Sequence, residues 1–410
     1  MSAPAVGSSV LRVAVLGAGA FGRNHLRVYR ELETEGRGVA LVAAVEPDPA
    51  RAAAAESQYG IPVFASVDEL LAADLKLAAA SVAVPTVHHH AVASALLGAG
   101  LDLLVEKPLA ATLAEADDLL ARAEKGRRIL QPGHLERFNP AVLAVEPALH
   151  RPMFFEAHRL SVFTPRALDV DVVLDLMIHD LDIVLTLAGS PVREVRAVGL
   201  PILSPRVDIA NVRVEFESGC VANFTASRVS TERVRKLRFF EPRQYVSIDY
   251  ARRDLLLIRI DPQAAPATAD SIAALLPPQV RAVVPRQALE SAAAGKVDSA
   301  TLRKYAALAG LDEATVERIA GAIQGQAGLS FEKPEIQPGE PLRLEILSFL
   351  DAVRSRSTPQ VTARQGREAL ALALEIQSSM AAHAERAGLE NFYNSGAQSG
   401  RSKSRETLRS

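Results

Sequence analysis

The sequence predicts an α/β domain with a doubly wound parallel sheet, followed by an α+β domain with an open, mostly antiparallel sheet. Two observations lead to this prediction. Short aliphatic runs alternate with helical segments over residues 1–133, and hairpin patterns dominate after that point. At 410 residues the chain is also long enough for two cores, because single cores stop growing at roughly 250–300 residues.

The first domain repeats a strand followed by a helix. Strands are expected over four aliphatic and β-branched ranges, 11–16, 39–45, 77–84 and 101–105. Helices are expected from about Ala20 and over 49–59, 89–97 and 112–125. This alternation is typical of βαβ units, so the strands should run parallel with helices on both faces.

The second domain, expected over residues 134–390, mixes hairpins with a few strong helices. Strand patterns cover 153–163, 192–202, 212–216, 221–227 and parts of 235–260, and an apolar helix is expected near 170–187. Residues 264–338 lose strand character and suggest a helical insertion, with helix-like pieces over 299–324. Amphipathic helices follow at 342–354 and 365–384, and residues 391–410 are expected to form a disordered tail.

Composition narrows the possible functions. A formal net charge of −2 provides no broad positive field for nucleic acid or an acidic membrane, so we expect a small ligand held in a local pocket. Cys220 is the only cysteine, which excludes an intrachain disulfide and a thiolate metal cluster. We find no signal-like start and no apolar run of the ~20 residues needed to span a bilayer, so we expect a cytoplasmic protein.

A glycine-rich loop directly follows the first predicted strand. In Gly17-Ala18-Gly19-Ala20-Phe21-Gly22, the first glycine allows a tight turn, the second lets the backbone approach a pyrophosphate, and the third lets helix and strand pack closely. The loop therefore predicts a Rossmann domain that binds a dinucleotide, with Gly17, Gly19, Ala20, Phe21 and Gly22 as cofactor ligands.

Glu46 ends the second predicted strand, about where this fold places an acid on the adenosine ribose. A carboxylate there can accept hydrogen bonds from both ribose hydroxyls and would repel a ribose phosphate. We therefore expect NAD rather than NADP, although a solvated loop acid would give the same pattern.

The triplet Glu106-Lys107-Pro108 directly follows another predicted strand, at the sheet edge where open α/β folds bind their ligands. A charged pair in this position is often only solvated, and a cis Lys107–Pro108 bond is plausible. Of three successive histidines, 88–90, we expect one to face the cleft. Pro85, His89, Glu106 and Lys107 complete the candidate cofactor-binding residues.

Asp175 and His179 lie four residues apart on the apolar helix and should share one face. An aspartate that accepts a hydrogen bond from a histidine could orient its ring and balance the imidazolium formed when it takes a proton. A core or capping histidine is the alternative, and we see no third cluster of ligands that would suggest a metal site.

Together, the loop 17–22, Glu106-Lys107-Pro108 and Asp175-x-x-x-His179 resemble the glucose-fructose oxidoreductase and inositol dehydrogenase (Gfo/Idh/MocA) family over roughly residues 12–382. The resemblance implies an α/β Rossmann domain, an α+β domain whose open sheet often forms a homo-oligomer interface, NAD as cofactor, and Lys107, Asp175 and His179 as catalytic residues. The long segment 264–338 departs from the family pattern and leaves substrate access and regulation open.

Three further segments, 133–140, 163–166 and 226–228, resemble family members that oxidise UDP-N-acetylglucosamine at its 3-hydroxyl. The resemblance implies that the product feeds an aminotransferase that makes a diamino sugar for lipid A. A diphosphate needs cations or backbone donors. The expected substrate contacts, which also include His179, are Arg137, Asn139, Arg166 and Arg228.

The expected reaction transfers a hydride from a sugar carbon to the nicotinamide while a base removes the hydroxyl proton. His179 is the first choice because its reference pKa near 6.5 suits neutral pH, whereas Lys107 would need its pKa of ~10.4 lowered. Two alternatives remain open. The protein could oxidise another sugar, a cyclitol or a nucleotide-linked uronate, or it could be a nonenzymatic NAD-bound sensor.

Overall fold

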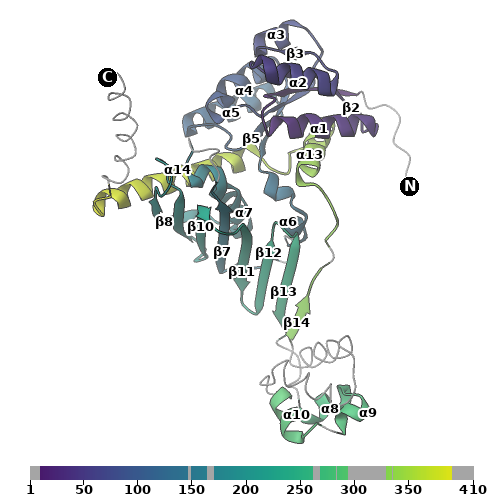
Figure 1. Ribbon diagram of the computed structural model, residues 1–410, viewed down its shortest axis with the longest axis vertical. Coiled ribbons are helices and arrows are strands. Elements are labelled where there is room, and N and C mark those ends of the chain that lie inside the picture. Colours follow the sequence, from purple (N-terminus) through teal and green to yellow (C-terminus); the bar gives the residue numbers. More distant parts are fainter. Residues whose placement is uncertain are drawn as a thin grey trace, which may run out of the picture.

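The computed structural model describes residues 10–145, 149–163, 170–261, 268–282, 284–293, 329–334 and 336–389. Arg166, the predicted helical pieces over 299–324 and the predicted disordered tail lie outside these residues. The described chain forms two sheets, with the helices of the first domain at one end of the molecule (Figure 1).

The first sheet confirms the predicted Rossmann topology. Its six strands are all parallel and follow the order β3-β2-β1-β4-β5-β6. The strands are β1 (Leu11–Leu16), β2 (Val39–Val45), β3 (Val63–Phe64), β4 (Ala79–Val82), β5 (Asp102–Glu106) and β6 (Leu130–Gly133). The helices are α1 (Gly22–Thr34), α2 (Pro49–Tyr59), α3 (Val67–Ala72), η1 (Thr86–His88), α4 (His89–Gly98) and α5 (Leu113–Gly126).

Local sequence explains where these elements begin. The four residues of β4 are all buried, as expected for a central parallel strand covered on both faces. Asp48 caps α2 by accepting a hydrogen bond from the Arg51 backbone N–H. Thr112 and Glu115 form a reciprocal capping box at the start of α5.

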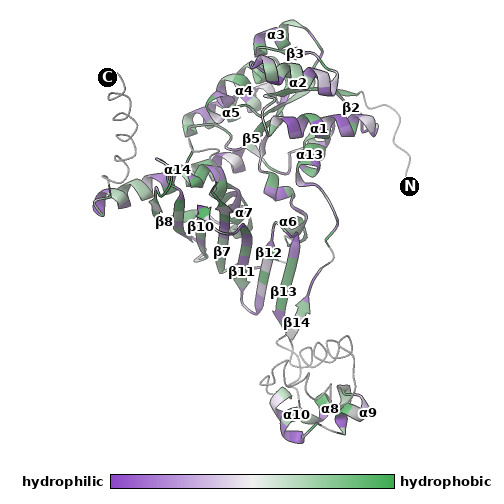
Figure 2. Cartoon of the chain, viewed as in Figure 1, coloured by the Kyte–Doolittle hydropathy of each residue, from purple (hydrophilic) through white to green (hydrophobic). Residues whose placement is uncertain are grey.

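The second sheet is mixed but mostly antiparallel, as predicted. Its eight strands follow the order β14-β13-β12-β11-β7-β10-β9-β8, and only β7 and β10 pair in parallel among the described strands. The strands are β7 (Phe154–Val162), β8 (Val192–Leu200), β9 (Ile209–Phe216), β10 (Val221–Ser230), β11 (Val234–Glu241), β12 (Gln244–Asp249), β13 (Asp254–Ile260) and β14 (Leu329–Glu332). Figure 2 shows polar and apolar residues alternating along several of these strands, which leaves one face for a core.

One expectation for residues 264–338 was wrong. Leu329–Glu332 forms β14, which pairs with β13 through Phe331 and Ile258, so the segment does not lack strand character throughout. A four-residue strand carries little pattern of its own, and its partner lies about 70 residues earlier in the chain, so pairing rather than local propensity determines it. The helical expectation holds for α8 (Ala269–Leu275), α9 (Pro278–Arg281) and α10 (Arg286–Ala293).

These three helices contain a small apolar cluster of their own, which includes Ile272, Leu276, Val280 and Leu289. In Figure 1 they lie beyond β14, at the far end of the second sheet from the first domain. The described part of the insertion therefore forms a satellite of the second domain and does not cover the cleft between the two sheets.

The C-terminal helices connect the two domains. Helix α13 (Pro341–Ser355) buries Ile346, Phe349 and Leu350 in the same cluster as Val13 of β1. Helix α14 (Ala363–Arg386) contributes Ile376 to the core of the second sheet. The proposed boundary at residue 133 stays a prediction, but α13 packs with the first domain, unlike the expectation that assigned both helices to the second.

The predicted apolar helix begins with an unusual turn. Residues Val173–Met177 (η4) form a π-helix, which continues as α7 (Ile178–Ala188). Asp171 caps this start by accepting hydrogen bonds from the backbone N–H groups of Val173 and Leu174. Single π-turns inside helices often lie at functional sites, and this one includes Asp175.

Candidate functional site

The glycine-rich loop has the geometry that a dinucleotide pyrophosphate requires. Gly17 has a φ of +93°, and a Cβ there would lie 2.7 Å from the Ala83 carbonyl oxygen. A Cβ on Gly22 would lie 1.8 Å from the Gly17 oxygen, whereas one on Gly19 would meet nothing within 4 Å. Helix α1 begins without a side-chain cap at Phe21. The backbone N–H groups at the start of α1 can therefore bind an anion, and the space next to Gly19 has room for it.

Glu46 lies at the end of β2 beside this loop and is 4% exposed. Its carboxylate accepts hydrogen bonds from the backbone N–H groups of Ala18 at 2.8 Å and Asp48 at 3.0 Å, and from Arg51 at 2.8 Å. Burial opposes ionisation, but the bonds from Arg51 and the two backbone groups lower the pKa of Glu46 overall. The acid is therefore ionised and held in place, as a ribose ligand should be.

A cavity of about 470 Å³ opens between the two domains, at the carboxyl ends of the first sheet's strands. The first domain lines it with Phe21, Ala83, Val84, Pro85, Thr86, His89, Glu106 and Lys107. The second domain adds Leu135, Glu136, Arg159, Asp175, Leu176, His179 and Arg235. The three predicted catalytic residues thus line one cavity.

Lys107 connects the two domains across this cavity. It follows β5, and its bond to Pro108 is cis. Its ammonium group donates a 2.7 Å hydrogen bond to the backbone carbonyl of Asp175 in the π-helical turn. Burial lowers the pKa of Lys107 from its usual value, although the nearby carboxylates of Asp175 and Glu106 oppose this change.

His179 lies one turn beyond Asp175, but the two side chains do not form the expected pair. Within the described residues, His179 Nδ1 is buried without a hydrogen-bond partner, and no bond joins the ring to the Asp175 carboxylate. Burial, Lys107 and Arg159 together lower the pKa of His179 well below its usual value. The ring is therefore neutral and able to accept a proton, and Asp175 contacts Lys107 through its main chain.

Two arginines in the cavity wall were not predicted from the sequence. Arg159 on β7 is 3% exposed, donates two hydrogen bonds to Asp180 and one to Glu136, and lies over the ring of Tyr250. Arg235 on β11 is about half exposed, and its nearest acid among the described residues is Glu136 at 4.0 Å. Successive side chains of a strand point to opposite faces of the sheet, and both arginines are on the face that lines the cavity. In the sequence alone, each looks like a surface arginine.

The histidine run has three different environments. His89 lines the cavity, and its ring lies 2.9 Å from each of two backbone carbonyls, those of Val84 and Pro108. Burial lowers its pKa. His88 is exposed, and His90 lies 2.7 Å from Asp118. His89 thus holds the backbone next to Pro85 through the Val84 carbonyl. The sequence predicted only that one of the three rings would face the cleft.

Glu106 also has a partner that sequence reasoning missed. His25 of α1 is fully buried, and its Nε2 lies 2.9 Å from a Glu106 carboxylate oxygen. A Cβ on Gly133 would lie 2.8 Å from the same oxygen. Glu106 is therefore fixed from both sides beneath the cavity, and it orients the strand end from which Lys107 projects.

Three residues expected to bind substrate lie elsewhere. Arg137 donates to Thr186 and lies 3.7 Å from Asp182, and Asn139 donates to Glu136 and the Tyr250 carbonyl. None of the three predicted residues lines the 470 Å³ cavity. For Arg137 the reason is that Thr186 and Asp182 are distant in sequence, so its side chain looked unpaired before folding.

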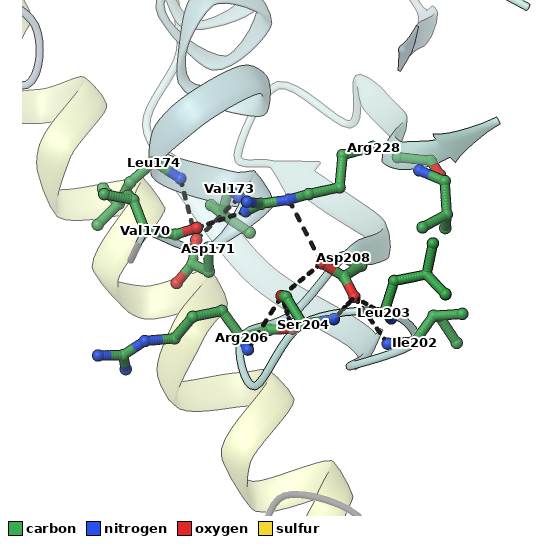
Figure 3. A network of polar contacts seen from close by, with 12 residues as sticks. Val170, Asp171, Val173, Leu174, Ile202, Leu203, Ser204, Arg206, Asp208 and Arg228 are labelled. Atoms are coloured by element: carbon green, nitrogen blue, oxygen red, sulfur yellow. Dashed lines mark hydrogen bonds and ion pairs between the residues drawn. The ribbon is translucent and has the colours of Figure 1, made fainter. Parts of the chain in front are cut away.

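Figure 3 shows the third of these residues, Arg228, in a polar network with Val170 and Asp208. It donates to the Val170 carbonyl and lies 3.5 Å from Asp208. Asp208 also accepts hydrogen bonds from the backbone N–H groups of Ile202, Leu203 and Ser204. The network fixes the chain just before Asp171, so the geometry favours a structural role for Arg228.

Two further features concern possible metal ligands and membrane-spanning helices. Within the residues that the structure describes, no group of three or more potential ligands is suitable for a metal ion. Over the same residues, no helix has the length and apolar content needed to cross a bilayer.

Two glycine variants test the cofactor loop. Gly22→Ala places a Cβ 1.8 Å from backbone, so we expect a lower melting temperature together with weaker NAD binding. Gly19→Ala meets no protein atom, so the melting temperature should stay unchanged while NAD binds at least about tenfold more weakly, or ~1.4 kcal/mol. Calorimetric titration and thermal melting separate the two effects. Wild-type NAD affinity in Gly19→Ala would contradict this geometry.

Comparison with known proteins agrees with this geometry. Residues 11–134 match the model of an oxidoreductase family with an NAD-binding Rossmann fold, and residues 142–242 match the GFO/IDH/MocA C-terminal domain. The chain is 37% identical over 246 residues to UDP-N-acetylglucosamine 3-dehydrogenase of Acidithiobacillus ferrooxidans, covering 60% of this chain and 76% of that enzyme. An inositol 2-dehydrogenase of Acidothermus cellulolyticus is 32% identical over 196 residues, but the match spans only 56% of its length and 46% of this chain.

A solved structure extends the match over both domains. The crystal form P21 of the Acidithiobacillus ferrooxidans enzyme aligns with a TM-score of 0.71 and 29% identity, covering 91% of this chain and 98% of that one. The predicted fold, the NAD cofactor and the oxidoreductase class are thereby confirmed. The chain belongs to the GFO/IDH/MocA family of NAD-binding oxidoreductases, which act on CH–OH groups.

Proposed function

We propose that this protein oxidises the 3-hydroxyl of UDP-N-acetylglucosamine to a ketone. The main supporting observation is the cavity between the domains, where Lys107 from the first and His179 from the second line one space beside the cofactor loop. The likeness to an enzyme of that name supports the choice of substrate.

The residues around the cavity are suited to NAD. The open space at Gly19, the uncapped start of α1 and the fixed carboxylate of Glu46 match the pyrophosphate and ribose of a dinucleotide. Pro85 and Phe21 both line the cavity. NAD bound there would supply the hydride acceptor for the oxidation of the substrate carbon.

Two groups of this chain can handle the hydroxyl proton. His179 is neutral because burial and its cationic neighbours lower its pKa, so it can act as the base at neutral pH. Lys107 is held by the Asp175 carbonyl and can donate a hydrogen bond to the substrate oxygen. We assign the base to His179 and the positioning of the oxygen to Lys107, while Asp175 fixes Lys107 through its main chain.

Arg235 favours an anionic substrate. Two acids already neutralise Arg159, whereas Arg235 lies 4.0 Å from a carboxylate that Arg159 also uses. Burial and Arg159 both lower the pKa of Arg235, which indicates that its cationic form lacks full compensation. The diphosphate of a nucleotide sugar supplies the missing negative charge, and an uncharged cyclitol does not.

The wider setting is part of the same proposal. A 3-keto nucleotide sugar is a substrate for an aminotransferase, so we place the protein before such an enzyme in a cytoplasmic route to the diamino sugar of lipid A.

The strands of the second sheet carry polar side chains on the face away from the core, including Arg213, Asn223 and Thr225. We propose that this face forms the homo-oligomer interface.

A substrate panel tests the function. Purified protein with NAD should form NADH with UDP-N-acetylglucosamine, especially when an aminotransferase drains the ketone, and far more slowly with inositol or free sugars. Because general acid–base catalysis contributes about 10²–10⁴-fold, Lys107→Ala and His179→Ala should each lower turnover by that factor. NAD affinity should change little, since neither residue contacts the loop that holds the pyrophosphate.

Exposed residues of the same types provide the controls. Lys76→Ala and His150→Ala remove a surface lysine and a surface histidine, and both variants should keep wild-type turnover. The proposal fails if inositol is preferred by the wild-type protein. The assignment of the catalytic residues fails if both cavity variants remain as active as the controls.

Arg235→Gln tests the anion contact and the pH dependence together. Arg235 is one of the cations that lower the pKa of His179, and the base works only above that pKa. Removing the charge should therefore raise the pKa and move the acidic limb of kcat/KM to higher pH, while KM for the nucleotide sugar rises at least about tenfold. Arg233→Gln removes the same charge outside the cavity wall and should change neither quantity. An unshifted acidic limb in Arg235→Gln would contradict the assignment.

A further inference from the structure

We propose that a buried row of polar side chains along α7 carries the reaction's proton from the catalytic cavity to a second cavity, with Asp182 as its acceptor. The row consists of His179 and Asp182 on the helix and His134, which lies against Asp182. This inference rests on the proposed oxidation of a hydroxyl at His179, because that reaction releases one proton for each NADH.

The spacing along α7 places the two cavities at successive turns of one helix. His179, Asp182 and Thr186 are three and four residues apart, so they lie on one face. His179 lines the catalytic cavity, whereas Asp182 and Thr186 line a second cavity of about 560 Å³. Gln365, Glu368 and Glu375 of α14 also line that second cavity. A single turn of helix thus separates the proposed base from another opening.

Several polar atoms of this row are buried without a protein partner. Among the described residues, no hydrogen bond reaches Nδ1 of His179, either ring nitrogen of His134, or either carboxylate oxygen of Asp182. His134 is 1% exposed and Asp182 is 2% exposed. Native proteins rarely leave such groups unsatisfied, and internal water is the usual partner.

The distances are consistent with links through water. His134 Nδ1 lies 3.7 Å from one Asp182 oxygen, and Arg137 Nη1 lies 3.7 Å from the other. Both separations are too long for direct hydrogen bonds but short enough for one water molecule to bridge each pair. Arg137 also donates to Thr186, so the guanidinium is fixed at the end of the row that faces the second cavity.

The neighbours of His179 disfavour a proton that stays on its ring. Lys107, Arg159 and Arg235, together with His134 of the row, oppose the protonated form of His179. Asp182, in contrast, is an acidic side chain that can accept a proton, and Arg137 lies 3.7 Å from it at the other end of the row. Because burial and these neighbours destabilise the protonated form of His179, an exit for the proton along α7 would relieve the site during turnover.

Two other acids face the row from neighbouring elements. Glu345 of α13 is fully buried with no hydrogen bond to its carboxyl oxygens within the described chain, and burial, Glu106 and Asp182 raise its pKa well above the usual value. It is therefore a neutral acid. Glu106 is held by His25. Of these three acids, only Asp182 lines the second cavity.

The proton balance is simple. As the carbon–hydrogen bond breaks and its electron pair leaves with the hydride, the hydroxyl proton moves to Nε2 of His179. The proton on Nδ1 then leaves through internal water to Asp182, which releases it to the water of the second cavity. After the ketone leaves, exchange through water moves the remaining proton from Nε2 back to Nδ1 and restores the starting tautomer. One proton leaves for each ketone formed.

Asp182→Asn tests this route because it keeps the size of the side chain and removes the acceptor. With the substrate identified by the panel, kcat should fall about 10²-fold, while NAD affinity stays unchanged. The kcat ratio between H2O and D2O should rise, and the isotope effect from deuterium on the reacting carbon should shrink, because proton release becomes limiting. Glu368→Gln makes the same chemical change in the wall of the second cavity and should change none of these values.

Asp182→Glu and His134→Gln extend the test. Asp182→Glu restores a carboxylate and should recover most of the lost kcat, which loss of packing alone would not allow. His134→Gln provides the measurement if Asp182→Asn does not fold, and it should also raise the solvent isotope effect. A high-resolution crystal structure should show ordered water bonded to His134 and Asp182.

Two results would overturn the route. One is wild-type kcat and a wild-type solvent isotope effect in both Asp182→Asn and His134→Gln. The other is a crystal structure in which protein groups alone satisfy these buried atoms. Failure of the proposed function has a different signature, because the wild-type protein itself would then leave UDP-N-acetylglucosamine unoxidised.

Discussion

The site depends on one buried guanidinium. Arg159 extends from β7 and joins Asp180 of α7 to Glu136 of the short helical turn η2 (Leu135–Phe138), with bonds of 2.7 to 3.0 Å. Burial opposes the charge of Arg159 and that of Asp180, so neither would be stable there alone. Removing one partner of such a group typically costs about 3–5 kcal/mol. Through these bonds Arg159 holds α7, which carries His179, against the second sheet. It also holds η2, which follows the last strand of the first domain, in the same position relative to α7.

The two domains meet in a fixed relation because the chain returns to the first one. After the second sheet, α13 packs Phe349 into the core beside β1, and α14 then crosses to the second core. Gly366 of α14 lies against Pro132, where a Cβ would approach the ring to 2.4 Å. The Lys107 ammonium can therefore reach the Asp175 carbonyl from the opposite domain, and one hydroxyl can contact groups from both domains.

Local patterns in the sequence predicted much of the fold and part of the site. The loop at Gly17, the acid at Glu46 and the strand end at Lys107 follow from short-range rules about turns and sheet edges. Arg235 and Arg159 were not predicted, because a strand arginine reveals nothing about the cavity until the sheet order is known. Arg228 was assigned to substrate for the same reason, since its partner Asp208 lies 20 residues away, directly before β9.

The central claim is that Lys107 and His179 act on one sugar hydroxyl beside the nicotinamide. The most direct test is a crystal structure of the wild-type protein with NADH and UDP-N-acetylglucosamine, a complex that cannot react. We predict that the 3-hydroxyl oxygen lies within about 3.2 Å of Lys107 Nζ and of a ring nitrogen of His179. A sugar bound with that hydroxyl outside the reach of both groups would contradict the account.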